Sequence, residues 1–170
     1  PLPLALLLIR RGVKTGIEGL TVCVMLLIAL MGPLRGPLVL FPYGFLSVWL
    51  GYCWAKSLSW WLSWSIGVFI GTFGFLVRVM VLSVLVGENL WVIITRAGAS
   101  LLEKGLDLFN LPFEPGIILV QIVAIGLVIT QEIIYVLCIH ALAYWIFPRL
   151  KASMPEPPSL LDSLVSIDPL

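Results

Sequence analysis

The chain has 170 residues, of which 61% are hydrophobic and 11% charged, and its mean hydropathy is +1.12. A soluble domain carries about 25% charged residues, so this composition excludes an ordinary soluble domain and predicts a polytopic membrane protein. The formal net charge of +1 implies no nucleic-acid partner.

Five apolar stretches follow one another; the first is expected to be the end of a membrane span, and each of the other four is expected to be a span. They cover residues 1–9, 16–31, 38–54, 60–86 and 116–147. The third is expected to bend near Pro42. The chain begins with Pro1 inside an apolar run, so we expect that it lacks its natural N-terminus and that the intact protein has six spans. The predicted fold class is an all-α membrane helix bundle over residues 1–150.

The long connection at residues 87–115 is predicted to form an amphipathic helix on the outer surface, ending near Asn110. Apolar residues repeat in it at helical spacing: Leu90, Ile94, Ala97, Leu101 and Leu108. Such a helix serves either as a lid or docking surface or as a solvated cap over the bundle.

The chain ends in a Pro-rich tail, residues 151–170. Leu160, Leu161 and Leu164 could form one apolar face there, which predicts docking to the protein's own bundle or to a neighbouring chain in the membrane.

Basic residues in short loops predict the orientation in the bilayer. Six of them fall on one side: Arg10, Arg11, Lys14, Lys56, Arg149 and Lys151. That side is expected to be cytoplasmic, together with the C-terminus. The predicted location is a bacterial plasma membrane or a thylakoid.

Small residues form a stripe along one face of the span at residues 60–86. Ser63, Gly67, Gly71 and Gly74 follow one another at offsets of 4, 4 and 3 residues, and Arg78 lies one turn further on. Small residues at this spacing let helix backbones approach closely in lipid. The stripe therefore predicts a helix-packing face and places Arg78 inward.

The last span carries Gln131 and Glu132. Placing a carboxylate in hydrocarbon costs several kcal/mol unless a cation or hydrogen-bond donor pairs with it. Counting from the Trp residues at the cytoplasmic ends of the two spans places Arg78 and Glu132 about 5 Å apart in depth. This predicts an Arg78–Glu132 ion pair with Gln131 nearby. Two interpretations stay open: a structural pair that joins two helices, or a polar site for an anionic or zwitterionic ligand.

No catalytic constellation occurs, since the sequence holds no G-x-S-x-G, no H-E-x-x-H and no phosphate-binding loop. The sequence predicts no enzyme and implies no cofactor. His140 is expected to be an interfacial hydrogen-bonding residue. Cys23, Cys53 and Cys138 are expected to be small apolar residues and not metal ligands.

Several features together resemble one family. They are Pro1 to Pro3 leading to Arg10-Arg11-Gly12, six inferred helices, the stretch from Glu103 to Asp107 before the last span, and Arg149. This layout resembles the YybS-like family of uncharacterised bacterial membrane proteins, and the ending Asp168-Pro169-Leu170 resembles its cyanobacterial branch. That family resembles the substrate-capture (S) subunits of energy-coupling-factor vitamin transporters. The small-residue docking face on the first helix of such subunits is missing here.

The resemblance implies a small-molecule substrate-capture component of a transporter, with Arg78, Gln131 and Glu132 near the ligand. The alternative is an accessory or assembly subunit of a larger membrane complex, such as a photosynthetic one. A cavity of about 300 Å³ or more lined by those polar residues would favour capture.

Overall fold

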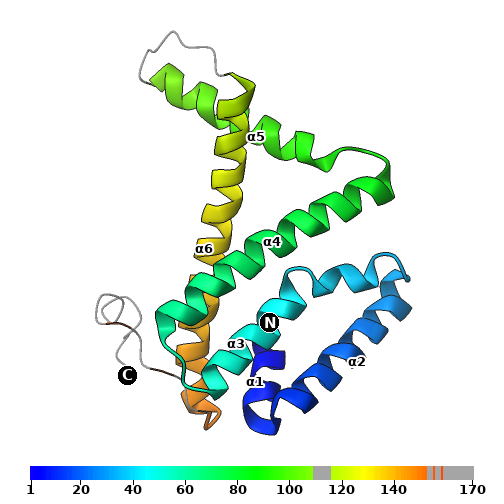
Figure 1. The fold of residues 1–170 in the computed structure, drawn as a ribbon, viewed down its shortest axis with the longest axis vertical. Helices are drawn as coiled ribbons and strands as arrows, with labels where there is room; N and C mark the ends of the chain where they lie inside the picture. Colours follow the sequence, from blue (N-terminus) through cyan, green and yellow to red (C-terminus); the bar gives the residue numbers. More distant parts are fainter. Residues whose placement is uncertain (109–115, 153–154, 156–157, 159–170) are drawn as a thin grey trace.

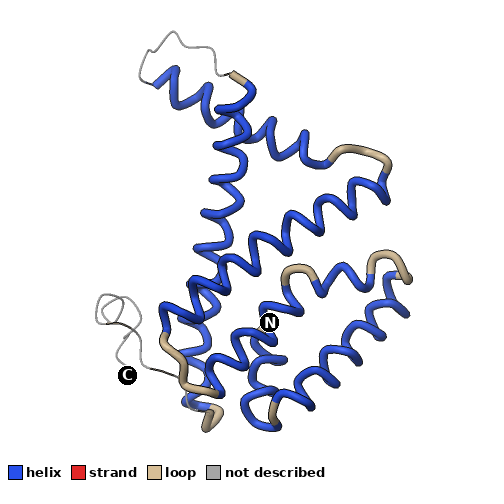
Figure 2. The backbone as a smooth tube through the Cα atoms, viewed as in Figure 1, coloured by secondary structure: helices blue, strands red, loops and turns tan. Residues whose placement is uncertain are grey.

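The computed structural model describes residues 1–108, 116–152, 155 and 158, and nearly all of these are helical (Figure 2). The elements in chain order are α1 (Leu2–Arg11), α2 (Val13–Met31), the 3₁₀ helix η1 (Gly36–Leu40), α3 (Tyr43–Ala55), α4 (Trp60–Val86), α5 (Leu90–Leu108) and α6 (Ile117–Arg149). No strand occurs among the described residues, so the predicted all-α fold class is confirmed.

Four segments of the described chain are long and apolar enough to cross a membrane. They are α2, η1 with α3 (Gly36–Ala55), α4 and α6. The bend predicted near Pro42 is the junction between η1 and α3. Residues 1–9, predicted to be the end of a span, belong to α1, whose 10 residues are fewer than the roughly 20 that a whole crossing needs, and their role as part of a span stays a prediction. A sixth span in an intact protein stays a prediction.

The N-terminal helix α1 turns sharply into α2 at Gly12, whose φ of 88° is a conformation that glycine adopts easily. It then lies against α3, where a Cβ on Gly51 would be only 2.9 Å from the Cα of Ala5. At its C-terminal end, Arg10 donates a hydrogen bond to the carbonyl of Leu150, just after α6. This hydrogen bond links the end of α1 to the C-terminal end of α6.

The loops with the predicted cytoplasmic charges gather at one end of the molecule. Figure 1 shows the α1–α2 turn, the α3–α4 loop and the C-terminal end of α6 on the same side. The grouping of basic loops thus agrees with the predicted alternation of spans. Which of the two ends faces the cytoplasm stays a prediction.

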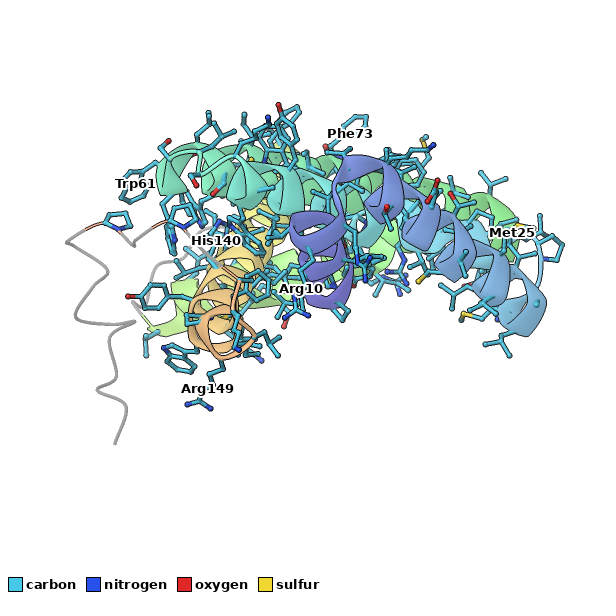
Figure 3. The ribbon with its side chains drawn as sticks, turned by 90° about the horizontal axis from the view of Figure 1, so that it is seen from below. Arg10, Met25, Trp61, Phe73, His140 and Arg149 are labelled. Carbon is cyan, nitrogen blue, oxygen red and sulfur yellow. The ribbon has the colours of Figure 1, made fainter. Side chains whose placement is uncertain are left out.

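The core lies where buried side chains of α3 meet those of α6, and α1 and α4 pack against the same cluster. Leu46, Leu50 and Cys53 from α3 are fully buried there and belong to one cluster with Val136 of α6. By contrast, Met25, Trp61 and Phe73 are exposed and lie at the outer edge of the structure (Figure 3). Exposed apolar side chains on spans of this kind face acyl chains in a bilayer.

The predicted amphipathic helix is α5, and it packs across the far end of α6, away from α1 and α3 (Figure 1). Asn89 accepts a hydrogen bond from the backbone N–H of Trp91 at its start, 3.1 Å long. A Cβ on Gly98 would lie 3.3 Å from the backbone nitrogen of Ala124, so the two backbones are close. Residues 109–115, which complete the predicted connection, lie outside the described residues.

Candidate functional site

The small-residue stripe of α4 faces α6 in one antiparallel register. The facing pairs are Ser63 with His140, Gly67 with Val136, and Gly71 with Glu132. Each step of four residues along α4 is matched by four residues back along α6, which is one helical turn on both. All four predicted packing residues, Ser63, Gly67, Gly71 and Gly74, are buried. We call this contact the α4–α6 seam.

Glu132 lies inside this seam, and only 3% of its surface is exposed. Its carboxyl group fills the space that a side chain at residue 71 would take, because a Cβ on Gly71 would clash with Oε2 and lie 3.1 Å from Cδ. Oε2 is buried and has no hydrogen-bond partner among the residues that the structure describes. A buried acceptor without a partner costs about 1–3 kcal/mol, which marks this oxygen as a group that a ligand or a proton could satisfy.

Arg78 is half-buried and lies over the ring of Tyr43, 5.5 Å from the ring centroid. The Tyr43 ring in turn meets the Tyr135 ring edge-on, with centroids 5.9 Å apart and planes at 69°. Tyr135 lies three residues after Glu132 and so projects from the same side of α6. We call Tyr43, Arg78, Glu132 and Tyr135 the polar cluster; it joins α3, α4 and α6.

The predicted ion pair is not formed, because Arg78 and Glu132 are not within 4.0 Å of each other in the described structure. The α4–α6 seam places Glu132 level with Gly71, so Arg78 lies seven residues, or about 10 Å, further along α4. The two helices also diverge beyond this point, towards α5 (Figure 1). The Trp-based depth count failed because Trp61 and Trp145 do not lie at matching positions in the seam.

Gln131 does not join the polar cluster, because its side chain is exposed on the other side of α6. Its neighbour Thr130 is also exposed and donates a hydrogen bond to the carbonyl of Gly126, 2.8 Å away. Neighbouring residues on a helix point about 100° apart, so burying Glu132 turns Gln131 outward.

His140 is fully buried between α4 and α6, level with Ser63 near the start of α4, and its position at the depth of the membrane interface stays a prediction. Its Nδ1 lies 2.9 Å from the carbonyl of Val136, and a carbonyl only accepts, so Nδ1 carries a hydrogen. Its Nε2 lies 2.9 Å from the Ser63 hydroxyl, which is equally close to the carbonyl of Trp60. The rings of Trp54 and Trp60 pack on the imidazole. Through these contacts His140 stabilises the packing of α6 against α3 and α4.

Two parts of the candidate site were not found by sequence reasoning. Tyr135 had a usable signal, since it lies one turn from Glu132 on the same helix face. Tyr43 had none, because only the packing of α3 on α4 and α6 brings it to Arg78 and Tyr135. The predicted docking residues Leu160, Leu161 and Leu164 lie outside the described residues.

Comparison with known proteins gives one result. No curated protein and no solved structure matches the chain. A family model described as "Predicted membrane protein (DUF2232)" matches residues 1–163, nearly the whole chain. Together with the four helices that can cross a bilayer, this match makes the chain an integral, multi-pass membrane protein. The chain belongs to the family of predicted membrane proteins DUF2232.

Proposed function

We propose that this protein is a non-catalytic, small-molecule substrate-capture component of a transporter, and that its ligand binds at the polar cluster. The observation that carries the proposal is Glu132 Oε2, a buried acceptor in a membrane helix that has no partner within the described structure. Ionisable residues inside a membrane are costly, and where they occur they commonly mark substrate or ion pathways.

The chemistry of the polar cluster favours a small zwitterion. Glu132 offers an acceptor to a ligand ammonium or other hydrogen-bond donor. Arg78 offers five N–H donors, and its contact in the described structure is the face of the Tyr43 ring, which occupies none of them in a hydrogen bond. The two tyrosine rings supply apolar walls. A few polar groups among apolar and aromatic surfaces are typical of small-molecule sites.

Ligand binding at this place requires the Glu132 carboxyl group to leave the space beside Gly71, because that group fills the space. Arg78 lies beyond Gly71, towards the C-terminal end of α4. On that side of the seam α4 and α6 diverge towards α5 (Figure 1). A ligand that bridges Glu132 and Arg78 would span about 10 Å along α4, the length of a small organic molecule.

The test is to purify the full chain in a mild detergent, release bound small molecules and identify them by mass spectrometry. We expect the wild-type protein to yield a zwitterionic compound, and Glu132→Gln and Arg78→Gln each to reduce its amount about tenfold or more, because each removes a charge-assisted contact. Gln131→Ala is the matched control, because its side chain is exposed beside Glu132, and it should retain the compound.

Equal amounts of the compound in all four proteins would contradict the proposed site. Recovery of a stoichiometric protein partner, with no small molecule, would instead support the alternative role as an accessory or assembly subunit of a membrane complex.

A further inference from the structure

A hollow of about 530 Å³ lies where α4 ends and α5 begins, and its lining includes no residue of the polar cluster. It is lined by Leu76, Val79, Met80, Ser83, Val84, Gly87, Glu88, Asn89 and Trp91. Its volume falls within the range of about 300–1,000 Å³ that is typical of small-molecule sites.

The lining changes from apolar to polar along α4. Leu76, Val79, Met80 and Val84 form an apolar wall on successive turns of the spanning helix, and Met80 and Val84 are exposed to the surroundings. Glu88 and the neighbouring residues lie just beyond the C-terminal end of the span. The hollow therefore runs from the acyl region of a bilayer to its headgroup region, about 17 Å from Leu76 to Gly87.

Two polar side chains that line the hollow already make hydrogen bonds within the protein. Ser83 Oγ donates to the carbonyl of Val79 at 2.8 Å and accepts from the backbone N–H of Leu90 at 3.0 Å. Asn89 Oδ1 accepts from the backbone N–H of Trp91 at 3.1 Å. The Glu88 carboxylate and the Asn89 side-chain NH₂ make no hydrogen bond or ion pair in the described structure. One negative charge and one amide donor are left for an occupant.

We propose that this hollow binds a bilayer phospholipid with a zwitterionic ammonium headgroup, of the phosphatidylethanolamine type. The lipid ammonium contacts the Glu88 carboxylate, and a phosphate oxygen accepts from the Asn89 amide. An acyl chain lies along the apolar wall of α4. Charge complementarity selects this occupant over an anionic lipid, whose headgroup would lack the cation and meet Glu88 with like charge. Trp91 lines the same end of the hollow as Glu88, and tryptophan commonly anchors membrane proteins at the headgroup level.

The test uses the full chain in nanodiscs that contain equal amounts of phosphatidylethanolamine and phosphatidylglycerol, each in turn carrying a photoreactive acyl chain. We expect phosphatidylethanolamine to label peptides within residues 76–91 about fivefold more than phosphatidylglycerol, the factor that one exposed ion pair can supply. Glu88→Gln should abolish this preference, because it removes the charge and keeps the shape. Glu103→Gln, an exposed carboxylate of α5 outside the hollow, is the matched control and should keep it.

A second variant, Val84→Trp, fills the hollow and should reduce labelling of these residues by both lipids. Equal labelling by the two lipids in the wild-type protein, or an unchanged preference in Glu88→Gln, would overturn the proposal. The proposal would also be overturned if a soluble single-chain amine reduced the labelling and unlabelled phosphatidylethanolamine did not. That result would assign the hollow to a soluble amphiphile. None of these readouts depends on the ligand proposed for the polar cluster.

Discussion

Gly74→Ala is expected to lower the free energy of unfolding by about 1–3 kcal/mol, the usual cost of overpacking a close contact. A Cβ at residue 74 would lie 2.7 Å from the Cα of Pro42 and 2.9 Å from its Cβ. Backbone atoms cannot rotate away, so α4 and the start of α3 would have to separate. The measurement is equilibrium unfolding of the purified protein in mixed micelles with increasing denaturing detergent.

Gly126→Ala is the matched control for this substitution. Gly126 also lies inside a membrane helix, but a Cβ there would meet no atom within 4 Å. Alanine has a helix propensity about 1 kcal/mol better than glycine, so Gly126→Ala should be neutral or stabilising. Equal stability of the two variants would show that α3 and α4 do not approach each other as described.

Gly71→Leu is expected to have the second large effect, because leucine would occupy the space of the Glu132 carboxyl group. Displacing a buried carboxyl group from a seam without another partner should cost about 1–3 kcal/mol or more. Gly71→Ala should be milder, since Oε2 is the end of a flexible side chain and can move slightly. Unfolding in mixed micelles again measures the difference.

A double variant, Gly71→Leu with Glu132→Ala, tests whether these two residues are in contact. Alanine at residue 132 removes the group that clashes, so the double variant should recover most of the stability lost by Gly71→Leu alone. Neighbouring residues commonly show coupling energies of about 0.5–3 kcal/mol in such cycles. Additive losses would mean that Glu132 and Gly71 are not in contact.

Local patterns in the sequence were enough to predict the helical elements. Apolar stretches long enough for a bilayer predicted α2, α4 and α6, and the spacing of apolar residues predicted α5. The stripe from Ser63 to Gly74 could be located because a helix brings residues three and four apart onto one face. These features depend on periodicity along one segment, which a sequence contains directly.

The contacts between helices were harder to predict. The Arg78–Glu132 pair failed because an error of three residues in the relative depth of two helices is about 4.5 Å, enough to move a charged side chain to another partner. The distance of His140 from Trp145 predicted its depth in the membrane, but that distance could not reveal that Ser63 and two Trp rings enclose the side chain. Tyr43 reaches the polar cluster only through packing of α3. Register and tilt are set by side chains on both partners, and neither helix alone encodes them.

The measurement that tests the α4–α6 seam most directly is disulfide formation between residues 67 and 136. A Cβ on Gly67 lies 3.1 Å from Cγ1 of Val136, so the two Cβ atoms are within about 4.6 Å, close to the spacing of a disulfide. The background would replace Cys23, Cys53 and Cys138 by alanine. Under mild oxidation, the Gly67→Cys/Val136→Cys protein should cross-link nearly completely, as measured by the loss of two hydrogens in its intact mass. Gly67→Cys with Glu132→Cys, one turn out of register, should not. Preferential cross-linking of that second pair would contradict the described register and, with it, the position of Glu132 on which the proposed ligand site depends.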